Sequence, residues 1–427
     1  MSTVIIFVLL LVLMLTGMPI SISLGLTVLS FLFFMTQVPI ESVALKLFTG
    51  IEKFEIMAIP FFILAGNFLT HGGVAKRMIR FATSMVGHWY GGLGLGGVLA
   101  CALFAAVSGS SPATVVAIGS ILMPAMVKAG FPKRFGAGVI TTSGALGILI
   151  PPSIVMVMYS VSTNTSVGAL FMAGVLPGIV LATMLGMTTW YRARSNNYPR
   201  QPKASWGERW TALRESIWGL LLIVIVMGGI YSGMFTPTEA AAMSAVWAFV
   251  CAVFIYKDLG LKDVPRVLLS SANMSAMLLY IITNAVLFSF LMTHENIPQA
   301  MADGMIGTGV GVIGFLLIAN VLLLAAGNFM EPSSIVLILA PILFPIATKL
   351  GIDPVHFGIL MVVNMEVGMC HPPVGLNLYV ASGITKMGIT ELTVATWPWL
   401  LTMLVFLVIV TYWPPLSLWL PRLVGIM

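Results

Sequence analysis

Apolar segments long enough to cross a lipid bilayer follow one another along nearly the whole chain. Of its 427 residues, 59% are hydrophobic and only 8% are charged, and the mean hydropathy is +1.06. So few polar side chains cannot cover a water-soluble surface. Segments of about 20 apolar residues are typical of membrane helices, whereas barrel strands alternate over about 10 residues. The sequence therefore predicts an all-α integral membrane protein with no soluble domain.

The common phosphate-binding and metal-binding motifs are missing from this sequence. No lysine follows a glycine, so there is no Walker loop for the phosphates of ATP. Cys101, Cys251 and Cys370 lie far apart in apolar segments and form no CxxC pair. We therefore expect any uphill work by this chain to use an energy source other than ATP.

The two halves of the chain repeat the same helix-breaking residues at a constant offset of 221 positions. A repeat of this kind indicates an internal duplication. The sequence predicts a first repeat at residues 1–190 and a second at 216–427, joined by a polar linker at 191–215. The pairs that share the offset are Pro124 and Pro345, Lys128 and Lys349, Gly130 and Gly351, Gly147 and Gly368, Pro151 and Pro372, and Pro152 and Pro373.

Each repeat is predicted to hold five membrane-crossing helices and one re-entrant helical hairpin. The hairpins, at about 91–127 and 307–348, are apolar blocks that a polar cluster interrupts midway. An odd number of crossings inverts the second repeat relative to the first, as in many secondary transporters. The crossing helices are expected at 3–15, 19–35, 56–69, 135–162, 167–191, 216–233, 238–256, 270–292, 354–382 and 392–413.

The basic residues sort to one side of this predicted topology. With the amino terminus outside, 16 of the 20 Lys and Arg residues fall on one face. Lys and Arg concentrate on the cytoplasmic side of membrane proteins. We therefore expect both termini outside and the linker in the cytoplasm, and the net charge of +6 requires no nucleic-acid partner. The four basic residues on the other face are Lys46, Lys53, Lys349 and Arg422.

Four interruptions of the helical chain are predicted at membrane depth: the hairpin tips at 108–112 and 327–332, and the double prolines that begin at Pro151 and Pro372. Non-helical chain is tolerated there only where it lines an enclosed cavity or binds a ligand. Freed carbonyls and serine hydroxyls are suitable ligands for Na⁺, and helix N-termini favour a carboxylate. Glu331 is a functional candidate because a charge at this depth is costly.

Simpler interpretations exist for several of these residues. A single SGSS cluster is most often a loop or a helix cap, but a second break at the symmetric position favours a functional role. A lone histidine in a break, His371, is most often a structural hydrogen-bonding residue. Four amides are each interpreted as interhelical hydrogen-bonding residues: Asn67, Asn284, Asn364 and Asn377.

Seven motifs carry a resemblance to a known family. They are GMPI at Gly17, AIPFFILAGNF at Ala58, SGSSPATVVAIGSILMP at Ser108, GILIPPS at Gly147, GMFTPTEAAA at Gly233, EPSSIVLILAPILFP at Glu331 and HPPVGLNLYVASGI at His371. Together they resemble the large membrane subunit (DctM or SiaM type) of tripartite ATP-independent periplasmic (TRAP) transporters. The resemblance covers essentially the whole chain.

The resemblance implies a Na⁺-driven importer of an organic acid, of the sialic acid or C4-dicarboxylate class, in a bacterial inner membrane. It implies a transporter and not an enzyme. In a bacterial inner membrane, the termini that the basic residues predict to lie outside would be in the periplasm. It also implies an elevator mechanism, in which the first three helices of each repeat form a scaffold and the remaining elements form a mobile transport domain. The implied partners are a small four-helix membrane subunit (DctQ or SiaQ type) and a periplasmic substrate-binding protein (DctP or SiaP type).

Carried onto matching residues, the resemblance implies two or more Na⁺ sites, each of which combines a hairpin tip with a helix break. The implied ligands of Na⁺ are Ser108, Gly109, Ser110, Ser111, Gly147, Pro151, Gly327, Asn328, Glu331, Gly368, Cys370 and Pro372. Substrate would lie between the sites, near Ser111, Ser153, Ser333 and Asn377. The sequence departs from the family at His371, where members commonly carry threonine before the prolines.

Two other classes of function are open to a chain with these residues. An intramembrane serine protease would use Ser110 or Ser111 as its nucleophile and His371 as its base. Their positions in separate repeats disfavour this hypothesis, because an internal duplication has no role in forming a protease active site. A passive channel would conduct without partners and without saturation.

Overall fold

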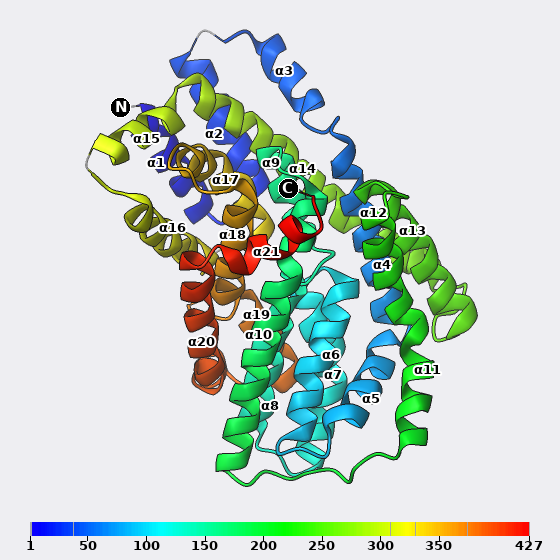
Figure 1. Ribbon diagram of the computed structural model, residues 1–427. Coiled ribbons are helices and arrows are strands. Elements are labelled where there is room, and N and C mark those ends of the chain that lie inside the picture. The colour runs from blue at the N-terminus through cyan, green and yellow to red at the C-terminus, as the bar shows by residue number, and fades with distance from the viewer. Residues whose placement is uncertain (1, 37, 308, 329, 374, 427) are drawn as a thin grey trace.

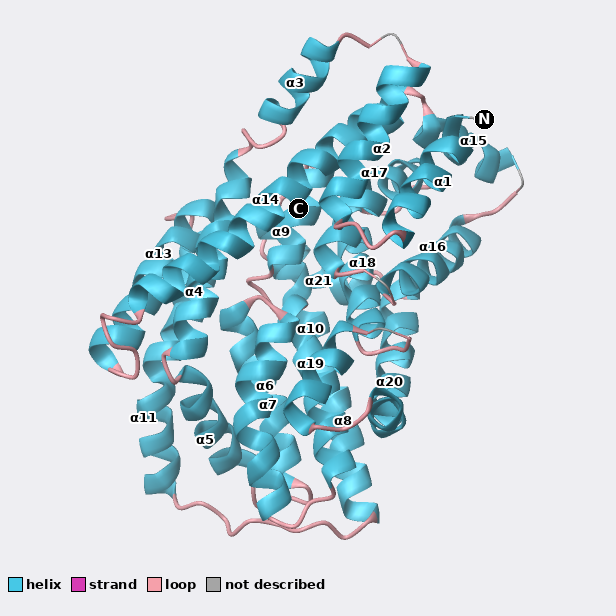
Figure 2. Ribbon diagram, turned by 180° about the vertical axis from the view of Figure 1, so that it is seen from behind, coloured by secondary structure: helices cyan, strands magenta, loops and turns pink. Residues whose placement is uncertain are grey.

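The computed structural model describes residues 2–36, 38–307, 309–328, 330–373 and 375–426, and in these ranges every regular element is a helix. The helices form an elongated bundle (Figures 1 and 2). Eight of the described helices are long and apolar enough to cross a membrane. The prediction of an all-α membrane protein is confirmed.

The first repeat begins with three apolar helices and continues into a hairpin and a broken helix. Short helices α3 and α5 flank the third apolar helix, which a 3₁₀ turn at Phe54–Met57 precedes. The elements are α1 (Ser2–Leu15), α2 (Ile20–Met35), α3 (Ile40–Thr49), α4 (Ala58–His71), α5 (Val74–Val86), the hairpin α6 (Gly92–Ser108) and α7 (Ser111–Lys128), the broken helix α8 (Lys133–Ser143) and α9 (Ile154–Thr163), and α10 (Val167–Ser195).

The second repeat follows the same order. Two of its helices end in π-helical turns, at Val224–Gly228 and Cys251–Ile255. The elements are α11 (Trp206–Ile223), α12 (Gly229–Tyr231), α13 (Pro237–Val250), α14 (Val264–His294), α15 (Ile297–Gly307), the hairpin α16 (Val312–Gly327) and α17 (Pro332–Lys349), the broken helix α18 (Pro354–Met369) and α19 (Leu376–Thr385), α20 (Ile389–Tyr412) and α21 (Pro415–Leu423).

The offset of 221 residues reappears in the helix boundaries. Helices α7 and α17 begin at residues 111 and 332, and α8 and α18 begin at residues 133 and 354. The hairpin arms α6 and α7 contain 17 and 18 residues, or about 25–27 Å of helix, against a hydrocarbon core of about 30 Å. Helices of this length can either cross the membrane or turn back within it, and α7 and α17 are among the eight that are long enough to cross, so the re-entrant form of the hairpins stays a prediction. The inverted orientation of the repeats stays a prediction.

Four short helices were not predicted from apolar runs in the sequence: α3, α5, α15 and α21. Helix α5 illustrates why, because its apolar residues recur at helical spacing and do not form a run. Val74, Met78 and Ile79 are buried, whereas Lys76 and Arg80 are exposed. The helix packs against α6 and α11 with its buried face. Amphipathic periodicity would have revealed it.

The linker is shorter than the predicted segment 191–215. Helix α10 continues to Ser195, and α11 already begins at Trp206 (Figure 1). A capping box starts α11: the amide of Glu208 donates to Ser205 Oγ at 3.2 Å, and the amide of Ser205 donates to Glu208 Oε2 at 2.7 Å. The spacing Ser-x-x-Glu was the sequence signal for this start.

Removal of this cap should loosen the first turn of α11. We expect Ser205→Ala to raise the hydrogen-exchange rate of amides 206–209 about fivefold, because the variant leaves a helix N-terminal amide without its acceptor. Thr211→Ala is the control, since its hydroxyl only returns to Gly207 O at 2.9 Å in the same helix. Equal exchange in both variants would contradict a role for the capping box.

Candidate functional site

The first hairpin tip lies directly against the first helix break. Gly109 adopts φ +61°, and a Cβ there would lie 2.7 Å from the carbonyl oxygen of Pro152. A Cβ on Gly147 would lie 2.6 Å from the carbonyl oxygen of Ser110. Only glycine permits backbone to approach backbone this closely. The contact brings backbone oxygens from the tip and from the break into one place.

Side chains within the first tip hold its shape. Ser108 Oγ lies 3.0 Å from Thr114 Oγ1, and Thr114 Oγ1 donates to the carbonyl of Ser110 at 2.8 Å. Ser108 and Thr114 are buried, and Ser110 is half-buried. Among the described residues the Ser110 hydroxyl makes no hydrogen bond with protein, so it remains available to a ligand.

The second tip meets the second break in the same manner. A Cβ on Gly368 would lie 2.9 Å from the Cα of Gly327. Across this contact, His371 Nδ1 lies 2.9 Å from Asn328 Oδ1, which confirms the interpretation of His371 as a hydrogen-bonding residue. Glu331 precedes α17 and accepts a hydrogen bond from Ser334 Oγ at 3.2 Å.

A polar cluster links the two repeats. Asn377 Nδ2, from the second break, donates to Ser111 Oγ at 2.8 Å in the first tip. The thiol of Cys370 donates to the carbonyl of Thr141 at 3.5 Å, and Asn377 Nδ2 approaches the same carbonyl at 3.4 Å. Asn377, Ser111 and Cys370 are all fully buried. The tip of one repeat is therefore fastened to the break of the other.

The broken helices run antiparallel to each other. Thr141 of α8 contacts Cys370 beyond the end of α18, and the hydroxyl of Tyr159 in α9 donates to the carbonyl of Pro354 at the start of α18 at 2.8 Å. The residue that is later in the first broken helix, Tyr159, contacts the start of α18, and the earlier one, Thr141, contacts the residue beyond its end, as antiparallel elements require.

Both tips open into one cavity of about 420 Å³. Helices α4 and α14 form its other wall, which contributes Asn67 and Thr70 together with apolar side chains of α14. Among the described lining residues, Glu331 is the only charged one. The lining residues include Asn67, Thr70, Gly109, Ser110, Ser111, Met274, Met277, Leu278, Glu331 and Ser333.

The electrostatics of this cavity come largely from helix ends. Helices α7 and α17 both begin at its wall, each with proline in the first turn and a row of backbone amides without intrahelical acceptors. The N-terminus of a helix carries about half a positive charge and favours an anion. Two such ends and one carboxylate therefore face the same space.

The predicted site residues divide into two groups. Gly109, Ser110, Ser111, Glu331 and Ser333 line the cavity. The other ten are not among its described lining residues. Ser153 accepts a hydrogen bond from the amide of Met156 at 3.4 Å and caps α9, Asn377 binds Ser111, and the thiol of Cys370 points to Thr141. Pro151 lines a separate apolar cavity, and the remaining six belong to the tips and breaks themselves: Ser108, Gly147, Gly327, Asn328, Gly368 and Pro372. Sulfur is a soft ligand, so only the carbonyl of Cys370 would suit Na⁺.

Sequence reasoning missed the α14 side of the cavity. Met274, Met277 and Leu278 sit at helical spacing, which is indistinguishable in sequence from ordinary core packing. Asn67 lines the cavity and also donates to Ser271 Oγ of α14 at 2.8 Å, as its interhelical interpretation requires. Asn364 similarly donates to Asn320 Oδ1 at 2.8 Å.

Paired hairpins and broken helices around a shared polar cavity define the class of membrane transporter with discontinuous helices. The family described as "Tripartite ATP-independent periplasmic transporter, DctM component" matches residues 7–416. The chain belongs to this family. Its relatives are named as transporter permeases, so the prediction that the chain is not an enzyme is confirmed.

Curated relatives match over nearly the full length. The chain is 77% identical to the C4-dicarboxylate TRAP transporter large permease protein DctM of Rhodobacter capsulatus, covering 100% of both chains. It is 50% identical to the protein of the same name from Vibrio cholerae, over 99% of this chain and 98% of that one. It is 36% identical to the sialic acid TRAP transporter large permease protein SiaM of Vibrio cholerae, over 96% of both.

A solved structure shares the fold. The YdaH transporter of Alcanivorax borkumensis superposes with a TM-score of 0.61 over 88% of each chain, at 16% sequence identity. At this identity the likeness concerns the arrangement of helices alone.

The contact between tip and break can be tested by adding one methyl group. We expect Gly147→Ala to lower the stability of the purified protein by about 1–3 kcal/mol, because its Cβ would press on the backbone of Ser110. Gly168→Ala is the matched control, since the nearest atom to its Cβ lies 3.6 Å away. Equal thermal unfolding midpoints for the two variants would contradict the packing described here.

Proposed function

We propose that the chain is the large membrane subunit of a Na⁺-driven importer of C4-dicarboxylates. The observation that carries this proposal is the charge of the shared cavity. A dicarboxylate would meet Glu331 and two helix N-termini there, and no described lining residue is Lys or Arg. Buried charges of one sign need compensation. Bound cations would supply it.

Na⁺ suits the atoms available at the two contacts between tip and break. Both contacts are rich in backbone carbonyls and carry hydroxyl or amide oxygens, which are ligands for a hard cation. We assign one ion to the contact between 108–111 and 147–152, and another to the contact between 327–331 and 368–372. The serine of the first tip with an uncommitted hydroxyl, Ser110, is the side chain we expect to bind the first ion directly.

The substrate class follows the names of the relatives. Three relatives at 77%, 50% and 54% identity are named for C4-dicarboxylates, whereas the relative named for sialic acid is 36% identical. A C4-dicarboxylate is small enough for a cavity of about 420 Å³. We expect its carboxylates to face the N-termini of α7 and α17, near Ser111 and Ser333.

The proposed partners follow from the tripartite description of the family. They are a small four-helix membrane subunit and a periplasmic substrate-binding protein. One relative, the isethionate TRAP transporter permease protein DctMQ of Oleidesulfovibrio alaskensis, matches 94% of this chain but only 64% of its own length. Its additional length leaves room for a fused small subunit. We place the assembly in a bacterial inner membrane, with both termini in the periplasm.

Transport in proteoliposomes that contain the chain and both partners tests this proposal. Uptake of labelled succinate should require an inward Na⁺ gradient and fall to background when choline replaces Na⁺. We expect Ser110→Ala to raise the Na⁺ concentration for half-maximal uptake about tenfold, as one lost oxygen ligand would. Ser162→Ala is the control, because its hydroxyl only bonds to Met158 O at 3.0 Å. Succinate uptake that does not depend on Na⁺ would refute the proposal.

We further propose an elevator mechanism, in which the hairpins and broken helices move against the scaffold. One polar contact between the two parts is made by Lys53. Lys53, in the loop before α4, donates to the carbonyl of Val161 at 2.5 Å and to Asn164 Oδ1 at 2.7 Å, at the C-terminus of α9. Burial lowers the pKa of the Lys53 ammonium, against the opposing effect of Glu55. An elevator must release this contact once in each cycle.

Cross-linking of this contact should arrest transport. We expect Lys53→Cys with Asn164→Cys, joined by a bifunctional methanethiosulfonate of lysine's reach, to lose uptake and to regain it when the disulfides to the reagent are reduced. The three native cysteines are buried, which limits background reaction. The untreated double variant is the control for loss of the hydrogen bonds. Full uptake by the cross-linked protein would contradict a moving transport domain.

A further inference from the structure

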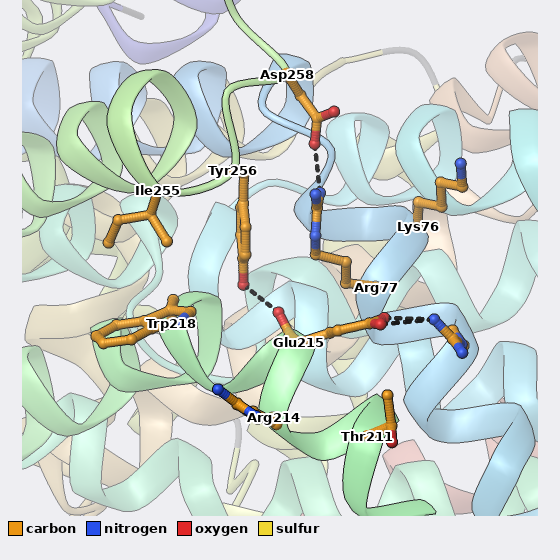
Figure 3. Close-up of a pocket in the computed structure, with 10 residues that line it drawn as sticks. Lys76, Arg77, Thr211, Arg214, Glu215, Trp218, Ile255, Tyr256 and Asp258 are labelled. Carbon is orange, nitrogen blue, oxygen red and sulfur yellow. Dashed lines mark hydrogen bonds and ion pairs between the residues drawn. The ribbon is translucent and has the colours of Figure 1, made fainter. Parts of the chain in front are cut away.

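A second cavity, of about 610 Å³, lies on the basic face of the molecule. It is separate from the cavity into which both hairpin tips open, the proposed transport cavity. Helices α5 and α11 and the segment that follows α13 enclose it (Figure 3). Its wall carries six charged side chains: Lys76, Arg77, Arg80, Arg214, Glu215 and Asp258. Four are basic and two are acidic, so the cavity has a net charge of +2.

The two acidic side chains are already neutralised. Asp258 forms an ion pair with Arg77, and both carboxylate oxygens of Glu215 accept from Arg80 Nη1, at 2.8 and 2.6 Å. Among the described residues, neither Lys76 nor Arg214 has an ion-pair partner. These two cations are therefore the groups left to attract an anion into the cavity.

The wall between these cations is rigid. The hydroxyl of Tyr256 donates to the carbonyl of Glu215 at 2.7 Å and accepts from the amide of Gly219 at 3.2 Å. The guanidinium of Arg77 lies 3.8 Å from the centroid of the Tyr256 ring. Figure 3 shows this ring beside Arg77. Ordered walls reduce the entropy that a ligand would lose on binding.

The surface next to the cavity is that of a lipid-facing helix. Helix α11 exposes Trp218 at the cavity and Ile217 next to it, which is 46% exposed, and Val224, directly after the end of the helix, is 63% exposed. Tyr and Trp concentrate where a membrane meets water. The basic cavity therefore borders exposed apolar side chains of α11 on the predicted cytoplasmic side.

We propose that this cavity binds the headgroup of an anionic phospholipid from the cytoplasmic leaflet. Lys76 and Arg214, on opposite sides of the cavity (Figure 3), would attract the phosphate, Trp218 would lie at the glycerol level, and the acyl chains would contact the exposed apolar side chains of α11. Basic pockets between membrane helices on the cytoplasmic side are suited to such headgroups. Inorganic phosphate carries the same negative charge as the headgroup, but it has no acyl chains to contact the apolar side chains of α11.

The test uses the full-length purified chain in detergent. Its thermal unfolding midpoint is followed while phosphatidylglycerol, phosphatidylcholine or inorganic phosphate is added. We expect a saturable rise with phosphatidylglycerol alone. The double variant Lys76→Gln with Arg214→Gln should need about 25-fold more of this lipid for half-saturation, about fivefold for each charge removed. Lys76→Gln alone, at an exposed position, should show the fivefold effect if the double variant does not fold.

The matched control removes two charges from the same face outside the cavity: Lys133→Gln with Lys203→Gln. We expect its half-saturation to stay within about twofold of the parent chain. An equal loss in both double variants would overturn the proposal in favour of diffuse attraction to the basic face. A full rise with inorganic phosphate would show a site for free anions, and a full rise with phosphatidylcholine would show that charge is not recognised; either result overturns the lipid site.

Discussion

Backbone amides and carbonyls cannot remain unsatisfied inside a membrane, and this chain interrupts its helices there four times. The interruptions pack against each other in pairs. The first tip contacts the first break through Gly109 and Gly147, and the second tip contacts the second break through Gly327 and Gly368. We call these two contacts the closures. The absence of a Cβ at these glycines is what permits the contact. The polar groups that the hairpin tips bring to the shared cavity depend on these two contacts.

The closures also explain how two distant segments of sequence can act together. Asn377 fastens the second break to Ser111 in the first tip, so a change at one closure has a direct route to the other. In the proposed mechanism, both ions lie beside helix ends that face the substrate. Cations that compensate Glu331 would make binding of the dianion favourable, and the dianion would do the same for the cations.

Much of this arrangement could be predicted from the sequence because helix-breaking prolines and glycines determine it. The offset of 221 residues located both tips and both double prolines, and hydropathy located the long helices. Helix α5 forms no apolar run because Lys76, Arg77 and Arg80 interrupt its apolar residues, and the start of α11 lies in a polar segment where the Ser205–Glu208 capping box is the signal for a helix. Asn377 was assigned to substrate, since a sequence does not tell whether a polar side chain faces a cavity or its neighbour. The contribution of α14 depends on tertiary packing alone.

The central claim is that Na⁺ supplies the positive charge that the transport cavity lacks. The most direct measurement is equilibrium binding of succinate to the purified chain at a series of Na⁺ concentrations, together with binding of Na⁺ at a series of succinate concentrations. The account predicts that each ligand strengthens the other by the same factor, of about tenfold or more. Succinate that binds equally well in choline and in Na⁺ would contradict it.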